Sequence, residues 1–388
     1  MSTMILSGVQ KSYGGTAVLK DFSLTVEDGE FVTLFGPGGS GKTTVLRLLA
    51  GLEHADGGRL QMDGRVVDDA CDSVFVSGAD RKIGMVFESG ALWPHMTVYN
   101  NIAFGLQLKK TDKQEVKRRV SETLQNLQIE HLADCPAAKL SRLEAQRAAL
   151  ARALVGGART ILIDGLPTNM GRDQRVELRG DLKRLHRDMG LTILLASQDQ
   201  EEALTLSTRV AVLDQGRVIQ ADSPIDLYQN PCSLTVARKI GTPKINLIPA
   251  KAQVAMGLMT VQSVLGIHQF GASAFTADTR EEPLFDCLVG VRPEQIVIDT
   301  QPTADSIQVK VYSCQPSGSE TIVQLLADGQ VLLAKCLGLR LFRSDQTVFL
   351  TIPADCITVF HQGTQRLIKT AALPIPDEGT QQRPSGRV

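Results

Sequence analysis

The sequence predicts two domains, an α/β domain over residues 1–236 and a smaller all-β domain over residues 237–370. Up to about residue 235, short apolar runs alternate with helical patterns, as in a domain built around a buried parallel sheet. Beyond about residue 237, short β-like runs are separated by turns. A chain of 388 residues is also long for a single hydrophobic core.

Five buried strands are expected in the first domain, because each of these runs is short and apolar. They are FVTLFG (31–36), KIGMVF (82–87), TILIDG (160–165), TILLAS (192–197) and VAVLD (210–214). Helices are expected directly after Lys42, from Lys113 to Gln128, from near Ser141, and from Arg175 to Met189.

The second domain is expected to contain only strands. The β-like runs are LVGVRPEQIVI, SIQVKVYS, TIVQLL, QVLLAKCL, TVFLTI and ITVF. The tail, residues 371–388, is rich in proline, glycine and polar residues and is expected to be disordered.

The composition excludes several classes of protein. A net charge of -1 gives no basic surface for sequence-independent nucleic-acid binding. The 7 cysteines are odd in number and scattered, without a C-x-x-C pair, which argues against a zinc site and a secreted disulfide framework. No stretch approaches the ~20 apolar residues of a membrane span, and the N-terminus lacks the pattern of a signal peptide. We therefore expect a cytosolic chain that meets membranes through partners.

The segment GPGGSGKT, Gly36 to Thr43, matches the phosphate-binding pattern G-x-x-x-x-G-K-[ST]. It stands between an apolar run and a helical pattern, which is the context that the motif requires. Its glycines allow backbone N–H groups to turn inward as an anion nest at a helix N-terminus. Lys42 is expected to reach the β- and γ-phosphates, and the Thr43 hydroxyl to ligate Mg²⁺. A Gly-rich turn without a ligand is the alternative, and the spacing and context argue against it.

Two further residues fit a nucleotide site. Within TILIDG the apolar strand ends in Asp164, where a Walker B aspartate would hold Mg²⁺. Any buried strand can end in an aspartate, so this assignment depends on the phosphate loop. Tyr13, in KSYGG, stands where its ring could stack on adenine, and a plain turn tyrosine is the alternative.

These residues resemble the ATPase subunits of ABC importers over nearly the whole chain. VFESGALWPHMTVYNNIAFGL is similar to the Q-loop segment of carbohydrate importers, and QDQEEALTLSTRVAVLDQGRVIQADSPIDLYQNP to the switch segment and the end of that domain. KIGTPKINLIPA, GVRPEQI, GSETIV and ITVFHQGTQRL resemble the β-barrel regulatory domain of the maltose-importer type. The resemblance implies an α/β P-loop NTPase domain of the ABC ATPase kind, followed by an OB-like (TOBE) regulatory domain.

The catalytic residues of that family are replaced in this chain. The resemblance places the catalytic glutamate at Gly165, which cannot polarise a water, and the switch histidine at Gln198, which carries no positive charge. The Q-loop glutamine is Glu88, an anion that would repel phosphate oxygens unless it ligates Mg²⁺. The D-loop reads TNMG, Thr168 to Gly171, and has lost its aspartate. Because phosphoryl transfer depends on positioning and electrostatic stabilisation, these losses should impair hydrolysis severely.

The signature loop, LSGGQ in the family, reads LSRLE here. In family dimers this loop completes the partner's nucleotide site. Ser141 is retained and could bond a γ-phosphate oxygen, but Arg142 and Leu143 replace the two glycines that let backbone N–H groups approach. Glu144 adds a negative charge near polyphosphate. The same residues also form a favourable helix N-terminus. We therefore expect an intact helix but weaker binding of the partner's nucleotide by this loop.

No catalytic residue is assigned, and the altered positions are Glu88, Gly165, Gln198 and the signature residues Ser141, Arg142, Leu143 and Glu144. The expected cofactors are ATP and Mg²⁺. The nucleotide would be held by Tyr13, Gly36, Pro37, Gly38, Gly39, Ser40, Gly41, Lys42, Thr43 and Thr44, and the metal by Thr43 and Asp164.

The sequence thus predicts an ATP-binding subunit of an import complex for a sugar, polyol or related solute, with its own hydrolysis lost or impaired. Expected partners are a sister or identical ATPase subunit, membrane permease subunits and, indirectly, a solute-binding protein, with no nucleic acid. The chain would lie at the cytoplasmic face of the inner membrane. The segment Glu88 to Tyr99 would receive the permease's coupling helix, with apolar contact from Trp93, Pro94 and Met96.

Three alternatives remain at this stage. One is a homodimeric ATPase in which Glu88 or Asp164 substitutes for the missing base. Another is a non-hydrolysing regulatory protein whose β-rich domain senses metabolites or sequesters transport partners. A nucleic-acid-linked ABC ATPase disagrees with the β-rich domain and with the neutral charge.

Overall fold

The computed structural model describes residues 3–275, 284–303 and 305–371. The chain divides into two compact units, Met1–Pro224 and Ile225–Val388. The division falls before the expected boundary at residue 236, because the helices α7 (Pro224–Gln229) and α8 (Leu234–Lys239) are tied to the second unit. Arg292 donates hydrogen bonds to backbone carbonyls in both helical segments, at Tyr228 and Ala237. The tail that was expected to be disordered lies, beyond Ala371, outside the described residues.

The first unit is organised by a six-stranded sheet in the order β11-β10-β3-β9-β8-β7. All pairs are parallel except the edge pair β10–β11. The strands are β3 (Phe31–Phe35), β7 (Ile83–Phe87), β8 (Thr160–Asp164), β9 (Thr192–Ser197), β10 (Arg209–Asp214) and β11 (Arg217–Asp222). All five strands expected from apolar runs are confirmed, because a parallel sheet covered on both faces requires such runs.

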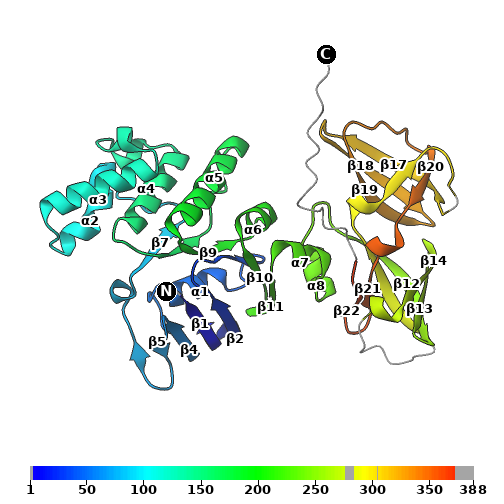
Figure 1. Ribbon diagram of the computed structural model, residues 1–388, viewed down its shortest axis with the longest axis horizontal. Coiled ribbons are helices and arrows are strands. Elements are labelled where there is room, and N and C mark those ends of the chain that lie inside the picture. The colour runs from blue at the N-terminus through cyan, green and yellow to red at the C-terminus, as the bar shows by residue number, and fades with distance from the viewer. Residues whose placement is uncertain (1–2, 276–283, 304, 372–388) are drawn as a thin grey trace, which may run out of the picture. The chain divides into compact units, whose positions relative to one another are not determined.

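Two hydrophobic layers cover this sheet. On one face, α1 (Lys42–Leu49) packs with Val32 and Leu34 of β3 and with the apolar side of a second sheet. On the other face, Ile161 and Ile193 pack with the remaining large helices. These are α2 (Val98–Leu108), α3 (Lys113–Asn126), α4 (Arg142–Leu154) and α5 (Arg172–Met189). Figure 1 shows α2, α3 and α4 grouped together, away from the second sheet.

The second sheet of this unit was not expected from the sequence. It is antiparallel, in the order β2-β1-β4-β5-β6. Its strands are β1 (Met4–Tyr13), β2 (Thr16–Val26), β4 (Gly57–Met62), β5 (Arg65–Asp69) and β6 (Val74–Phe75). Only one side of β1 and β2 meets the core, so their apolar residues are interleaved with polar ones and form no continuous run.

The expected helices are present with shifted ends. The helix α3 ends at Asn126 rather than Gln128, because Gln128 has the left-handed φ of 58°. The helix α5 begins at Arg172, three residues before Arg175. Among the described residues, four α-helices were not expected: α2, the short α6 (Gln200–Leu206), α7 and α8.

The second unit is built, apart from its two short helices, from two antiparallel sheets that share one hydrophobic core. The first sheet has the order β14-β13-β12-β15-β21-β22, with β12 (Asn246–Ala255), β13 (Leu258–Ser263), β14 (Gly266–Gly271), β15 (Phe285–Val291), β21 (Thr358–His361) and β22 (Leu367–Lys369). The second has the order β16-β20-β17-β18-β19, with β16 (Val297–Asp299), β17 (Ile307–Pro316), β18 (Glu320–Ala327), β19 (Gln330–Leu337) and β20 (Thr347–Thr351). The expected strands are confirmed, and β12, β13, β14 and β22 are additional.

Across the described residues, no helix is both long and apolar enough to cross a membrane.

Candidate nucleotide-binding site

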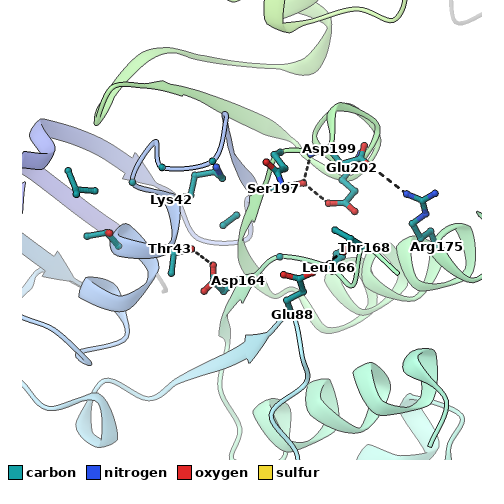
Figure 2. A pocket seen from close by; sticks show the side chains of 18 residues that line it. Lys42, Thr43, Glu88, Asp164, Leu166, Thr168, Arg175, Ser197, Asp199 and Glu202 are labelled. Atoms are coloured by element: carbon teal, nitrogen blue, oxygen red, sulfur yellow. Dashed lines mark hydrogen bonds and ion pairs between the residues drawn. The ribbon is translucent and has the colours of Figure 1, made fainter. Parts of the chain in front are cut away.

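The candidate site lies where the carboxyl ends of four parallel strands, β3, β7, β8 and β9, meet. This edge is where ligands bind in open α/β sheets. It holds a cavity of about 370 Å³ that is shown from close by in Figure 2. The cavity is lined by Val18, Gly38, Gly39, Gly41, Lys42, Thr43, Thr44, Glu88, Asp164, Gly165, Leu166, Thr168, Arg175, Ala196, Ser197, Gln198, Asp199 and Glu202.

The loop between β3 and α1 needs glycine at two positions. A Cβ on Gly36 would lie 2.6 Å from the carbonyl oxygen of Leu213, so the loop cannot pass β10 with any other residue. Gly41, the N-cap of α1, has a φ of 98°, and a Cβ there would lie 2.5 Å from Leu19. Gly41 also provides no side-chain cap. The first backbone N–H groups of α1 therefore face the cavity as an anion site at a helix N-terminus.

The Lys42 ammonium lies inside this loop. It donates hydrogen bonds to the carbonyl oxygens of Gly36 (2.8 Å) and Pro37 (2.7 Å), and to the Ser40 hydroxyl (3.2 Å). These contacts hold the positive charge at the mouth of the loop. Ser40 is buried and contributes to the loop's shape rather than to the lining of the cavity.

Thr43 and Asp164 meet across the floor of the cavity. The Thr43 hydroxyl donates to Asp164 Oδ1 at 2.7 Å, although the two residues are 121 positions apart. A hydroxyl and a carboxylate are oxygen ligands of the kind that Mg²⁺ prefers, and both stand beside the helix N-terminus that suits a polyphosphate. The residues present therefore fit MgATP. Thr43 and Asp164 would hold the metal, which neutralises phosphate charge when bound.

Gly165, directly after Asp164, has the left-handed φ of 85°. The three atoms nearest to a Cβ on it all belong to Glu88, with its Cβ at 3.7 Å and its Oε2 at 3.8 Å. The other carboxylate oxygen of Glu88, Oε1, accepts a hydrogen bond from the Thr168 hydroxyl at 3.2 Å. Two altered positions, 88 and 165, are thus direct neighbours.

Behind Gln198 lies a buried carboxyl that the sequence analysis missed. Glu202, only 7% exposed, accepts a hydrogen bond from the Ser197 hydroxyl at 2.5 Å. Burial raises the pKa of Glu202 to about 7, with a smaller contribution from the nearby Asp199. Figure 2 shows Ser197, Asp199 and Glu202 together at one side of the cavity. The run QDQEEA carries acidic residues at helical spacing, but the sequence pattern does not indicate that its second glutamate, Glu202, is buried.

Arg175 is a second lining residue without a sequence signal. Its guanidinium lies 3.9 Å from Asp199 Oδ2 and is 40% exposed. Asp199 also caps α6 by accepting from the backbone N–H groups of Glu201 and Glu202. Together with Lys42, Arg175 gives the lining of the cavity its positive charge.

Tyr13 does not line the cavity. Its ring is 41% exposed, and its hydroxyl donates to a carboxylate oxygen of Glu53, which also pairs with Arg47 of α1 at 3.3 Å. The Lys11 ammonium lies 5.6 Å from the ring centroid. These contacts hold the ring near α1, and adenine stacking on Tyr13 stays a proposal.

The signature residues begin α4. Ser141 is its N-cap, and Glu144 completes a capping box by accepting from the Ser141 N–H at 2.7 Å. These hydrogen bonds lower the pKa of Glu144 and hold its carboxylate on its own helix. Leu143 is buried in the core. Arg142 is exposed and lines a shallow depression of about 520 Å³ together with Thr43, Glu88 and Asp164.

The segment after Glu88 is firmly held. Arg152 of α4 donates to the carbonyl oxygens of Gly90 (2.9 Å) and Ala91 (2.6 Å). The Arg152 guanidinium also lies 5.4 Å from the Trp93 ring centroid. Trp93 packs against Phe104 with ring centroids 4.6 Å apart, yet remains 36% exposed. Of the three expected permease contacts, Trp93 and Pro94 are exposed and Met96 is half-buried.

Two family models match the chain. One, described as ABC transporter, matches residues 19–169, and the other, described as TOBE domain, matches residues 289–360. The first contains the phosphate loop, the Glu88 segment, the signature loop and Asp164. The second falls within the all-β unit.

Curated relatives match most of the chain. The sn-glycerol-3-phosphate import ATP-binding protein UgpC of Brucella abortus is 35% identical over 95% of this chain and 99% of its own length. The spermidine/putrescine import ATP-binding protein PotA of Haemophilus influenzae is 40% identical over 76% of each chain. The uncharacterized ABC transporter ATP-binding protein YurJ of Bacillus subtilis is 34% identical over 95% of this chain and 100% of its own length.

Solved structures resemble somewhat more than half of the chain. The cbiO1 protein of Clostridium perfringens, part of the ABC transporter complex cbiONQ, gives a TM-score of 0.53 at 26% identity, covering 58% of this chain and 90% of its own. The ATP-binding cassette MJ0796, bound to ADP and Pi, gives a TM-score of 0.50 at 26% identity, covering 57% of this chain and 98% of its own.

Proposed function

The chain belongs to the ATP-binding subunits of ABC importers, and on that premise we propose that it binds MgATP for transport while its own hydrolysis is severely impaired. As in its family, the nucleotide is ATP with Mg²⁺, and the chain acts with permease subunits and a solute-binding protein. Its place is the cytoplasmic face of the membrane, peripheral through the permeases.

One contrast within the cavity carries this proposal. The Lys42 loop and the Thr43–Asp164 pair keep the donors and oxygen ligands that a nucleotide and its metal need. At the next residue, Gly165 has no side chain and a φ of 85°, which a glutamate rarely adopts. The cavity therefore retains the groups that bind MgATP but lacks the side chain that would polarise the attacking water.

A sister ATPase would supply the missing chemistry. In a head-to-tail pair of unlike subunits, one site joins this chain's phosphate loop to the sister's signature loop and holds ATP without rapid hydrolysis. The other site joins the sister's complete catalytic set to the signature loop of this chain, Ser141, Arg142, Leu143 and Glu144. Because both sites are affected, turnover of the pair should be slow but not zero.

The solute is proposed to be a polyol or a related small organic compound. UgpC, which matches 95% of this chain, is named for a phosphorylated polyol. PotA, named for spermidine and putrescine, matches a smaller part of the chain. A transport assay of the reconstituted complex with labelled glycerol 3-phosphate, and with spermidine as the competing solute, tests this proposal.

The test of the chain itself separates binding from turnover. The purified chain should bind MgATP, and it should hydrolyse far below about one ATP per second, the lower end of ordinary enzymes. Lys42→Ala should abolish the binding. Turnover near one per second that is lost in Lys42→Ala would contradict the proposed impairment.

The test of the pair uses the copurified complex with its permeases. Replacing the catalytic glutamate of the sister by glutamine should lower the ATPase activity of the complex to the small fraction that this chain's own impaired site supplies. If that variant still hydrolysed ATP at the parent rate, this chain would be the catalyst and the sister role would be wrong.

A further inference from the structure

We propose that Glu88 acts as the general base of this chain's own nucleotide site, in the place that the side chain of residue 165 has vacated. The inference rests on the proposed binding of MgATP, and it deepens that function by naming the group responsible for slow residual hydrolysis. It is carried by the geometry of two loops that lie at the ends of the neighbouring strands β7 and β8.

The first step is the position of the carboxylate. β7 pairs in parallel with β8, and the register sets Phe87 opposite Asp164. The next residues on both strands, Glu88 and Gly165, therefore leave the sheet side by side. Glu88 Oε2 lies 3.8 Å from where a Cβ on Gly165 would stand. A side chain at position 165 would therefore begin in van der Waals contact with this carboxylate, which comes from the neighbouring strand.

The second step is how the carboxylate is held. Thr168 donates to Oε1 and fixes one oxygen. On the chain side, Gly90 donates its N–H to the Phe87 carbonyl at 2.8 Å, and Arg152 binds the carbonyls of Gly90 and Ala91. Glu88 is thus carried on a tight turn pinned to α4. A base that is held in one place by its neighbours loses little entropy when it acts.

The third step compares the acidic groups of the cavity. Asp164 accepts from Thr43, Asp199 caps α6, and Glu202 is buried against Ser197. Among the described residues, none donates a hydrogen bond to Glu88 Oε2. Its lone pairs are therefore available to accept a proton, and Glu88 is exposed enough to meet water.

The proposed step is a hydrolysis that balances without an added reactant. The water oxygen forms a bond to the γ-phosphorus, and the bond from that phosphorus to the β–γ bridging oxygen breaks. One water proton passes to Glu88 Oε2, and the bridging oxygen leaves on ADP with its electron pair. The products are ADP and inorganic phosphate, and Glu88 returns its proton to solvent.

The test measures binding and chemistry separately on the full-length chain. MgATP affinity is measured by titration, and hydrolysis by single turnover with the chain in excess over ATP. Glu88→Gln keeps the shape and should leave the affinity within about threefold, while lowering the single-turnover rate by roughly 10²-fold, as for loss of a general base. After gel filtration, the variant should retain unhydrolysed ATP where the parent retains ADP.

The controls make each outcome decisive. Glu122→Gln, the same exchange on the exposed face of α3, should keep the parent rate. If Glu88→Gln weakens MgATP binding as strongly as Asp164→Asn does, then Glu88 is a metal ligand and the inference is wrong. It is equally wrong if Glu88→Gln hydrolyses ATP at the parent rate, or if the parent binds MgATP without any turnover. Failure of the parent to bind MgATP contradicts instead the proposed function.

Discussion

The two ends of the nucleotide cavity differ in how much of the family's chemistry they keep. At the phosphate-loop end, Lys42 is held by three oxygens and Thr43 is paired with Asp164. At the other end, position 165 has no side chain and position 198 carries an uncharged amide. Affinity for a nucleotide depends on charge and backbone donors that stay fixed, whereas turnover depends on groups placed at the reacting water. The two functions can therefore be lost separately.

The largest expected effect concerns the buried carboxyl group of Glu202. It lies at the altered end of the cavity, which is the end that contains positions 165 and 198. Because burial raises the pKa of Glu202 from its ordinary 4.5 to about 7, the folded state binds this proton more tightly than the unfolded state. The free energy of unfolding should then decrease as pH rises from about 4.5 to about 7. Glu202→Gln should remove this decrease and gain, above pH 7, on the order of 3 kcal/mol relative to the parent.

Urea unfolding between pH 5 and pH 8 measures this difference. Glu122→Gln, which removes a carboxylate that is 56% exposed, serves as the control and should follow the parent's pH dependence. If the free energy of unfolding of the parent did not change across this pH range, the buried Glu202 would not destabilise the folded state and the prediction would be wrong.

The next largest effect tests the retained end. Asp164→Asn keeps the hydrogen bond with Thr43 but removes the charge offered to Mg²⁺. It should weaken ATP binding in the presence of Mg²⁺ by about 10- to 100-fold, in the range found for groups that support a metal site. Affinity measured with and without Mg²⁺ checks this. Gln198→Ala, at the altered end, should cost clearly less, and an equal cost would remove the distinction between the two ends.

A smaller effect is expected from restoring the family's glutamate. Gly165→Glu places an L-residue at a φ of 85° and should destabilise the chain by about 1–2 kcal/mol. The new carboxylate would also stand beside Glu88, so activity should recover little. Gly165→Ala introduces the same backbone strain without the added charge. Urea unfolding of both variants therefore separates the destabilisation due to the backbone from that due to repulsion between the two carboxylates. Robust ATPase activity of Gly165→Glu in the isolated chain would disprove this reading of the altered end.

The smallest effect concerns the signature loop. Arg142→Gly should raise the ATPase rate of the assembled complex by a few-fold, because this exposed residue adjoins the partner's nucleotide in the proposed pair. Full repair of SRLEA to SGGQQ is the less clean experiment, because Leu143 is part of the core and its removal costs about 2–5 kcal/mol of stability. Arg142→Lys keeps the charge and should match the parent. A rate that is unchanged in Arg142→Gly would locate the defect elsewhere.

The sequence by itself determined the parallel sheet and the phosphate loop. The strands β3, β8 and β9 are apolar runs because both of their faces are buried. The loop Gly36 to Thr43 was predictable for a related reason, since its backbone shape is fixed by glycines at set spacing and by the helix that follows. The antiparallel sheet around β1 was missed, because a sheet with one exposed side alternates polar and apolar residues irregularly.

Only the tertiary structure decided how the altered residues relate to one another. Glu88 and Gly165 are neighbours because β7 and β8 pair in parallel, and no local pattern links two strands so far apart in the chain. The φ of Gly165 and the burial of Glu202 likewise depend on what packs around them. The sequence shows which catalytic side chains are missing at separate positions. Long-range packing decides which remaining side chain lies beside the space that they left.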